Sequence, residues 1–267
     1  MRIVLTIAGS DSSGGAGIQA DLKTLAAYGV YGASAVTAIT VQNTTGVMSS
    51  VVLAADLVTA QIEAVAADLQ IDAVKIGMLG TAAVVEAVAA AIEALDLPQL
   101  VVDPVMISKS GARLLDEDGI GMLRSELLPR AMVVTPNIPE AEVLSGRRIE
   151  SLEQARAAAY EICKLGASAV VVTGGHAAGD RITDVLFDGA MFTELHTTRI
   201  DTPNTHGSGC TFASSIAANL ALGHSVVDAV VNAQAYVTGA IEHALAIGHG
   251  HGPLDHFWRS RSATKSQ

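Results

Sequence analysis

The fold is decided by residues 73–103, which run AVKIGMLGTAAVVEAVAAAIEALDLPQLVVD. The stretch opens with the short apolar segment Ala73–Ile76 and closes with another, Leu100–Asp103; between them, Ala82–Leu95 has the alanine-rich pattern of a helix. Both short segments are apolar at consecutive positions, as expected of parallel strands that helices cover on both faces. The stretch therefore predicts one strand–helix–strand unit of a parallel α/β sheet.

The same alternation extends in both directions along the chain. Further strands are predicted at Ile3–Ala8, Ser34–Val41, Met132–Thr135 and Ala169–Thr173. Further helices are predicted at Ala16–Tyr28, Asp56–Leu69, Gly119–Leu128, Pro139–Leu144 and Leu152–Leu165. After Thr173 the pattern predicts an antiparallel hairpin, Ile182–Phe187 with Met191–Thr197, as a candidate cover for a site. Two long helices, Gly209–Leu222 and Ser225–Ala246, are expected to follow.

Composition narrows the possible function classes. The chain has 267 residues, of which 50% are hydrophobic and 3% aromatic, and its formal net charge is −11 at pH 7. Scarce aromatic residues and an acidic balance argue against nucleic-acid and anionic-membrane surfaces. No shift in composition marks a boundary, so we expect a single domain over residues 1–258, followed by a polar, disordered tail over 259–267.

The cysteines and the apolar segments indicate the cellular compartment of the protein. The two cysteines, Cys163 and Cys210, make no disulfide framework and suit a reducing compartment. The N-terminal apolar run meets Asp11 at once, which is unlike a signal peptide. The longest apolar stretch, Leu79–Leu97, contains acidic residues, which favours a buried helix over a membrane span. We therefore expect a cytoplasmic protein.

The loop after the first predicted strand is rich in glycine. Residues 15–20 match a dinucleotide-binding fingerprint, but the second predicted strand ends at Val41–Thr44 without the carboxylate that this motif needs. Residues 9–14 have the glycine spacing of a phosphate loop, but Gly15 and Ala16 stand where Lys and Ser or Thr are required. What remains is a loop with an exposed acid, Asp11, which is either a tight turn or backbone packed against a small ligand.

The strongest functional signal is at residues 204–211, NTHGSGCT, which precede a long apolar helix. Small residues let successive amide N–H groups converge, and the positive end of the helix adds to them. This arrangement suits a phosphoryl group in transfer; the alternative is an ordinary glycine-rich helix entry. The helix dipole is expected to lower the pKa of the Cys210 thiol. The alternative is a buried, inert cysteine, which is commoner. We assign Cys163 to that inert class.

Two carboxylates follow predicted strands. Asp103 ends one strand, and Glu140 lies shortly after another. Because ligands of an open parallel sheet bind beyond the carboxyl ends of its strands, both are candidates to hold Mg²⁺, mostly through water. The alternatives are a turn residue before Pro104 and an acid that favours a helix N-terminus.

Three further features carry weaker signals. Gln42 offers a donor and an acceptor that suit a heteroaromatic edge, although a core glutamine would look the same. Glycines 174 and 175 end a predicted strand, which suits a turn or a nucleotide phosphate. His249 and His251 form an H-x-H pair in a glycine-rich loop, which is poor support for a metal site.

Taken together, these motifs resemble the hydroxymethylpyrimidine/phosphomethylpyrimidine kinases of thiamine biosynthesis, which belong to the ribokinase-like superfamily. The resemblance runs from Leu5 to about Phe257. It rests on TIAGSD at 6–11, GGAGIQADLK at 14–23, KIGML at 75–79, DPVM at 103–106, TPN at 135–137 with Glu140, and NTHGSGCT at 204–211. It implies a ribokinase-like three-layer α/β fold, with a mostly parallel central sheet flanked by helices.

The resemblance also implies an activity and a set of site residues. The enzyme would use ATP to phosphorylate a small molecule, 4-amino-5-hydroxymethyl-2-methylpyrimidine, and then its monophosphate. The pyrimidine would be bound by Gln42, with Gly9, Asp21 and Met78 shaping the pocket. The anion hole would consist of Gly207, Ser208, Gly209 and the amide of Cys210, whose thiol stands where sugar kinases carry an aspartate base. ATP would be bound by Asn137, Thr173 and Gly175, and Mg²⁺ by Glu140 and Asp103. The resemblance further suggests a homodimer.

Two alternatives stay open. Thr173 stands where many close relatives have Lys, and some pyridine or pyrimidine kinases of the superfamily use Thr there. This keeps a pyridoxal kinase of vitamin B6 salvage as one alternative; a non-catalytic pyrimidine-binding protein on the same fold is the other. An alcohol must lose its proton in the first transfer, whereas a phosphomonoester is already mostly ionised. The Cys210→Ala variant is therefore predicted to harm the first step more than the second.

Overall fold

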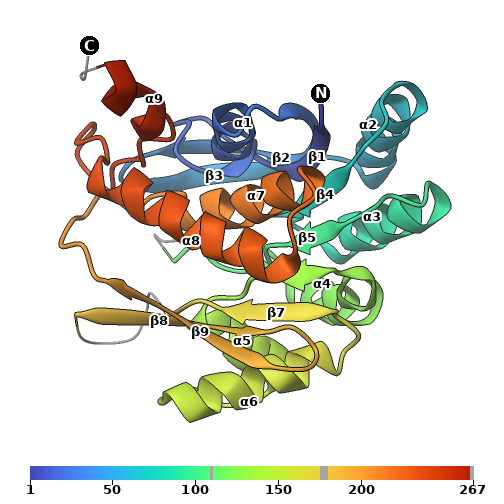
Figure 1. Ribbon diagram of the computed structural model, residues 1–267. Helices are drawn as coiled ribbons and strands as arrows, with labels where there is room; N and C mark the ends of the chain where they lie inside the picture. Colours follow the sequence, from blue (N-terminus) through green and yellow to red (C-terminus); the bar gives the residue numbers. More distant parts are fainter. Residues whose placement is uncertain (109–110, 175–179, 265–267) are drawn as a thin grey trace.

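The computed structural model describes residues 1–108, 111–174 and 180–264 and builds them around one large sheet. The sheet has the strand order β3-β2-β1-β4-β5-β6-β7-β8-β9 (Figure 1). Its strands are β1 Ile3–Asp11, β2 Tyr31–Asn43, β3 Gly46–Val52, β4 Ala73–Ile76, β5 Leu100–Val102, β6 Val133–Val134, β7 Ala169–Val172, β8 Arg181–Phe187 and β9 Phe192–Thr198.

The middle of the sheet is parallel and its two margins are antiparallel. Strands β2, β1, β4, β5, β6 and β7 pair in parallel. At one margin β3 turns back on β2, and at the other β8 and β9 turn back on β7 and on each other. The predicted hairpin is thus confirmed, but it extends the central sheet rather than standing apart from it. Its role as a cover stays a prediction.

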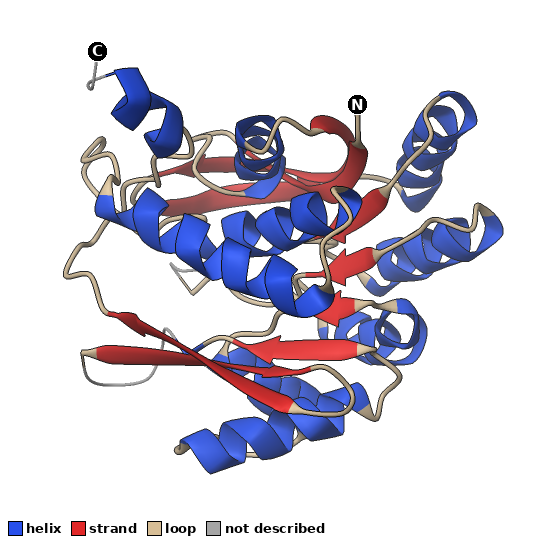
Figure 2. Cartoon of the chain, in the orientation of Figure 1, coloured by secondary structure: helices blue, strands red, loops and turns tan. Residues whose placement is uncertain are grey.

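Helices cover both faces of the sheet, which confirms the predicted three-layer α/β fold (Figure 2). The helices are α1 Gly17–Ala27, α2 Ala55–Asp68, α3 Ala82–Ala94, α4 Glu117–Met122, α5 Ile138–Ser145, α6 Leu152–Cys163, α7 Ser208–Ala221, α8 Val226–Glu242 and α9 Trp258–Thr264. One apolar core lies beneath α2 to α6, and the other lies beneath α1, α7 and α8.

Consecutive residues of the central strands point into opposite cores. In β4, Ala73 joins the core under α7 and α8, whereas Val74 joins the core under α2 and α3. In β5, Val101 and Val102 divide in the same way. Because both faces are buried, these strands are apolar at consecutive positions. This arrangement leaves the carboxyl ends of the strands as the place where polar side chains can gather.

The structure differs from the sequence-based expectations in three places. Strand β3 was not predicted, because Gly46–Val52 contains two serines and most of its residues are exposed. The predicted helix 119–128 is a short α4 continued by a π-helical turn, Leu123–Leu127, and a 3₁₀ turn, Leu128–Arg130. The expected disordered tail instead begins with α9, which extends from Trp258 to Thr264.

Candidate active site

A large cavity lies beyond the carboxyl ends of the parallel strands. Its volume is about 1050 Å³. Its wall brings together most of the residues that the sequence motifs singled out: Gly9, Gln42, Met78, Asp103, Asn137, Glu140, Thr173, Gly207, Ser208, Gly209 and Cys210. These residues come from segments as far apart in the chain as β1 and α7. Gly175, a predicted ATP-binding residue, lies outside the described residues.

The start of α7 forms one wall of the cavity. Gly207 has a φ of 84°, a left-handed conformation that favours glycine, and a Cβ at this position would overlap the carbonyl oxygen of Gly15. Ser208 then begins the helix, and no side chain among the described residues caps its first turn. The Gly207–Gly209 backbone and the positive end of the helix dipole therefore face the cavity, as an anion site requires.

Cys210 lies in the first turn of α7, but its thiol does not have the lowered pKa expected from the helix dipole. Burial, partly offset by the positive charge of Lys75, raises the pKa of Cys210 to about 12. The negative charges of Asp103 and Asp21 act in the same direction as burial. The thiol is therefore protonated at neutral pH, and it lies beside the Asp103 carboxylate. Desolvation outweighs the helix dipole here.

A buried ion pair lies directly behind this wall. Lys75 Nζ is 3.0 Å from both carboxylate oxygens of Asp21, and both side chains are fully buried. Asp21 also accepts hydrogen bonds from Thr6 Oγ1, at 2.6 Å, and from Ser214 Oγ, at 2.7 Å. Asp21 thus does not line the cavity as expected; it holds Lys75, which does line it. A Cβ on Gly77 would come within 2.8 Å of Lys75 Nζ, so this glycine makes room for the cation.

Asp103 and Glu140 form a pair of buried carboxylates at the centre of the cavity. Asp103 Oδ2 is buried and has no hydrogen-bond partner among the described residues. Burial raises the pKa of Asp103 despite the nearby Lys75, and burial together with the charge of Asp103 raises the pKa of Glu140. Two neighbouring acids with an unpartnered oxygen fit a hard divalent cation such as Mg²⁺.

The site lacks the further ligands of an all-protein metal cage. No group of three or more His, Cys, Asp or Glu side chains suited to a metal occurs in the described part of the chain, and this includes His249 and His251. A cation between Asp103 and Glu140 would therefore complete its coordination with water and ligand phosphates, as Mg²⁺ commonly does. The residues present fit the metal in that role.

Asn137 fixes the position of Glu140 through a capping box at the start of α5. Glu140 N donates to Asn137 Oδ1 at 2.9 Å, and Asn137 N donates to Glu140 Oε2 at 3.0 Å. One oxygen of Glu140 is thus tied to the backbone of its own helix. The N-x-x-E spacing follows from this local geometry, and it aims the carboxylate at the cavity.

Beyond α5, the cavity wall continues along β7 and β8. Thr173 N donates to Pro136 O at 2.9 Å, which places Thr173 next to the Asn137 segment. Asp184, on β8, accepts hydrogen bonds from Gly174 N at 2.7 Å and from Gln234 Nε2 at 2.8 Å. Thr173, Asp184 and Gln234 all line the cavity. This half of the cavity is the side expected to take the nucleotide.

The opposite half of the cavity lies at the ends of β1, β2 and β4. Gly9 lies at a register shift between β1 and β2, and a Cβ there would come within 3.0 Å of Met78 Sδ. Thr37 Oγ1 donates to Met78 O at 2.6 Å and fixes that segment. Gln42, near the end of β2, presents its amide to the same space. A flat ring with hydrogen-bonding edges suits this half.

Asp11 is not the exposed acid that the sequence suggested. It is 3% exposed, and its carboxylate accepts hydrogen bonds from the backbone N–H groups of Ser13, Gly15 and Ala16. His206 Nε2 lies 2.9 Å from Asp11 Oδ2. The two glycine-rich loops, separated by almost 200 residues, are therefore joined by this contact.

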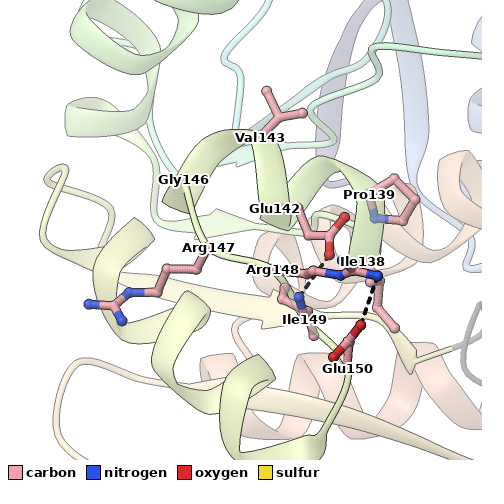
Figure 3. A pocket seen from close by; sticks show the side chains of 9 residues that line it. All are labelled: Ile138, Pro139, Glu142, Val143, Gly146, Arg147, Arg148, Ile149 and Glu150. Carbon is pink, nitrogen blue, oxygen red and sulfur yellow. Dashed lines mark hydrogen bonds and ion pairs between the residues drawn. The ribbon is translucent and has the colours of Figure 1, made fainter.

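A second hollow lies outside the cavity, around the turn between α5 and α6 (Figure 3). Its volume is about 980 Å³, but its charged side chains are already paired. Arg148 forms an ion pair with Glu150 at 2.8 Å, Arg147 pairs with Glu161 at 2.8 Å, and Glu142 accepts a hydrogen bond from Ile149 N. We therefore assign the functional site to the first cavity.

Sequence reasoning missed several residues of the cavity. Lys75, His206, Asp184 and Gln234 all line it without having been singled out. Lys75 carried a usable signal, because a lysine within the apolar strand segment AVKI must have a buried partner. His206 stands within the NTHGSGCT motif, but the motif does not show its contact with Asp11, which is distant in the sequence, and Asp184 carried no signal.

Comparisons with known proteins agree with this geometry. The family model described as phosphomethylpyrimidine kinase matches residues 11–255. A Bacillus subtilis protein named hydroxymethylpyrimidine/phosphomethylpyrimidine kinase is 48% identical over 260 residues, covering 97% of this chain and 96% of its own. A B. subtilis pyridoxal kinase, solved as an ADP complex, is 39% identical with a TM-score of 0.91, covering 97% of this chain and 99% of its own.

A phosphomethylpyrimidine kinase structure from Clostridium difficile is 42% identical with a TM-score of 0.81, covering 90% of this chain and 100% of its own. The resemblance seen in the sequence motifs is thereby confirmed across nearly the whole chain. The ribokinase-like fold is likewise confirmed by these solved kinases. The chain belongs to the phosphomethylpyrimidine kinase family.

Proposed function

We propose that this enzyme transfers the γ-phosphoryl group of ATP to 4-amino-5-hydroxymethyl-2-methylpyrimidine and then phosphorylates the resulting monophosphate. The observation that carries the proposal is the strand order, which puts two groups of lining residues at opposite ends of one cavity. Gln42, near the end of β2, and Met78, after β4, would contact the ring. Asn137 and Thr173, which follow β6 and β7, would contact the nucleotide. The start of α7 and the two carboxylates lie between them, where the phosphoryl group must pass.

The protein's own residues supply positioning and electrostatic stabilisation. The backbone of Gly207, Ser208 and Gly209 would hold the oxygens of the phosphoryl group as negative charge develops on them. Asp103 and Glu140 would hold Mg²⁺, which neutralises phosphate charge when it is bound. Lys75, buried behind α7, keeps its positive charge beside this wall, and the carboxylate of Asp21 balances that charge. These groups offset the repulsion that a chain of net charge −11 would exert on ATP.

Cys210 acts mainly as a neutral thiol in this proposal. Its thiol is protonated at neutral pH because its pKa is raised to about 12, so it is a poor base in the resting enzyme. Its sulfur lies beside the Asp103 carboxylate. The proton of the alcohol would leave in the first transfer only; the second acceptor is a phosphate that is already mostly ionised.

The test is turnover of ATP by the purified enzyme with three acceptors in parallel: the hydroxymethylpyrimidine, its monophosphate and pyridoxal. The proposal expects turnover with both pyrimidines and loss of both activities in the Glu140→Gln variant, which keeps the shape of the side chain. The absence of turnover with any acceptor, combined with tight binding of the pyrimidine, would replace the proposal with a non-catalytic binding function.

Pyridoxal kinase is the second candidate function. The specific observation that favours it is the TM-score of 0.91 to a pyridoxal kinase, against 0.81 to a phosphomethylpyrimidine kinase structure. Its substrate, too, is a flat heteroaromatic ring with a hydroxymethyl group. Faster turnover with pyridoxal than with the pyrimidine in the assay above would favour this candidate.

We further propose that the enzyme is a cytoplasmic homodimer. Ile39, Val41 and Val51 are each more than half exposed, and Ile39 lies opposite Val51 on one face of the β2–β3 pair. A second copy would cover this apolar face. Both cysteines are free thiols, which suits a reducing compartment. No helix in residues 1–108, 111–174 and 180–264 has the length and apolarity needed to cross a bilayer. Light scattering of the purified protein tests the dimer.

A further inference from the structure

His206 contacts both Asp11 and the side-chain amide of Gln42. His206 Nε2 lies 2.9 Å from Asp11 Oδ2 and 3.2 Å from Gln42 Nε2. On its other side, the Gln42 amide lies 3.2 Å from Thr40 Oγ1. Asp11 is buried, His206 is mostly buried, and Gln42 borders the cavity. One chain of contacts thus leads from a buried carboxylate to the proposed ring-binding amide.

The charge of Asp11 fixes the hydrogen on His206. Burial alone would raise the pKa of Asp11, but hydrogen bonds from His206, Ser13 and Ala16 lower it to about 2. Asp11 is therefore an ionised carboxylate at neutral pH and can only accept hydrogen bonds. The nitrogen that faces it, His206 Nε2, must carry a hydrogen, whether the imidazole is neutral or charged.

The hydrogen on His206 in turn fixes the amide of Gln42. As placed, the amide nitrogen faces Nε2, so two donors oppose each other at 3.2 Å, while the amide oxygen faces Thr40 Oγ1. A half-turn of the amide exchanges its oxygen and nitrogen, so that the oxygen lies beside the single Nε2–H and shares it with Asp11 Oδ2 in a three-centre hydrogen bond. The nitrogen then faces Thr40 Oγ1, which is free to accept because its own hydrogen is donated to Ser10 O at 2.9 Å. Both neighbours of the amide favour this same orientation.

We propose that Asp11 and His206 are positioning residues that lock the Gln42 amide with its oxygen toward His206 and its nitrogen toward Thr40. This orientation leaves one N–H and one oxygen lone pair for a ligand. The locked amide selects a ring that presents an acceptor nitrogen next to an exocyclic amino group, as a 4-aminopyrimidine does. A pyridine ring without that amino group cannot satisfy both atoms. The proposal rests on the proposed function for its substrate class.

The orientation of the amide can be measured without any turnover. In protein labelled with ¹⁵N-glutamine, the Gln42 side-chain signal is the one that disappears in the Gln42→Glu variant. The proposal expects nuclear Overhauser contacts from its N–H protons to the methyl group of Thr40. Contacts to the ring protons of His206 instead would overturn it. This result does not depend on which substrate the enzyme phosphorylates, so it separates the proposal from the proposed function.

The KM values of His206 variants then test whether this orientation of the Gln42 amide contributes to binding of the pyrimidine. His206→Leu removes the donor, His206→Gln keeps an N–H near the same place, and His224→Leu is the matched control at an exposed histidine outside the cavity. The expected result for His206→Leu is a rise of about tenfold in KM for the pyrimidine, the size of one hydrogen bond. Its KM for ATP should change less than twofold, and His206→Gln and His224→Leu should each stay within about threefold of the native enzyme.

Two outcomes would overturn the positioning role. One is a folded His206→Leu enzyme whose KM for the pyrimidine is unchanged. The other is equal impairment of His206→Leu and His206→Gln, which would show that the shape of the imidazole matters and its donor does not. If His206→Leu does not fold, Thr40→Val replaces it, since Thr40 holds the other side of the amide. That variant should raise the same KM, and an unchanged KM would contradict the proposal.

Discussion

Lys75 and Asp21 form a fully buried ion pair, 3.0 Å apart, directly behind the first turn of α7. The pair ties β4 to α1, and through Ser214 it is also tied to α7. Burial alone would lower the pKa of Lys75, but the charge of Asp21 raises it above its usual value. The cation is therefore permanent at neutral pH, and it faces the wall on which phosphates are expected to bind.

The first prediction concerns this pair. Lys75→Met leaves the buried Asp21 carboxylate without its counter-ion, so we expect a loss of about 3–5 kcal/mol in the free energy of unfolding. The double variant Lys75→Met/Asp21→Asn removes both charges and should recover part of that loss. Urea unfolding of the single and double variants measures both quantities. A double variant less stable than Lys75→Met would contradict the ion-pair explanation.

The second prediction separates two glycines of the anion loop. At Gly209 the atom nearest to an added Cβ is Asp103 Oδ2 at 3.9 Å, so Gly209→Ala should fold normally. Its methyl group would nevertheless stand where a phosphate must approach the backbone. We expect phosphoryl transfer to fall by about 100-fold with no decrease in melting temperature.

Gly207→Ala is the contrasting variant. Its φ of 84° and the overlap of its Cβ with Gly15 O predict a loss of stability as well as of activity. Thermal unfolding and initial rates, measured on both variants, distinguish the two effects. Native activity in Gly209→Ala would show that phosphate does not bind at this turn.

The third prediction concerns Cys210. Replacing it with alanine removes the thiol beside Asp103 and any help that it gives in removing the proton of the alcohol. We expect the first transfer to slow by about tenfold or more, and the second by about threefold, because the second acceptor is already ionised. Separate initial rates with the alcohol and with its monophosphate measure the two losses. Equal losses in both steps would show that Cys210 serves the anion hole alone.

The fourth prediction is a pH dependence of stability. Burial lowers the pKa of His256 to about 4, and this side chain lies 3.1 Å from Thr211 Oγ1. The unfolded chain binds this proton near pH 6.5 and the folded chain does not, so His256 contributes a loss of stability as the pH falls from 6.5 toward 4, while the raised pKa values of Asp103 and Glu140 act in the opposite direction. The His256 contribution should reach about 3 kcal/mol. Asp11, with a pKa lowered to about 2, adds a separate loss only below about pH 4.

Two variants test whether His256 causes this pH dependence of stability. His256→Gln keeps a polar partner for Thr211 but does not titrate, so as the pH falls from 6.5 to 4 its stability relative to that of the native enzyme should rise by the His256 contribution. The exposed His224 provides the matched control, and His224→Gln should keep the native slope. An unchanged slope in His256→Gln would assign the acid sensitivity to another group.

The sequence was sufficient to predict the layers of the fold and most of the cavity wall. Buried parallel strands must be apolar on both faces, and the carboxyl ends of such strands share one edge, so Asp103 and Glu140 could be placed together in advance. Strand β3 escaped prediction because its exposed serines give no alternating pattern. The burial of Asp11 was equally hidden, because its partner His206 lies 195 residues away.

The electrostatic state of the site was the least predictable part. The position of Cys210 in a helix first turn suggested a lowered pKa, and this was wrong because desolvation exceeds the dipole. Asp21 was expected to touch the ligand, whereas its contacts with Thr6 and Ser214 place it one layer behind. The pKa of Cys210 and the position of Asp21 both depend on how deeply the side chain is buried, and a single sequence does not specify that depth.

The most direct test of the central claim is a time course of products by ³¹P NMR, with the hydroxymethylpyrimidine and excess ATP. One cavity that serves both transfers predicts a monophosphate signal that rises and then falls as a diphosphate signal replaces it. Accumulation of the monophosphate alone, with no diphosphate while ATP remains, would contradict the two-step account.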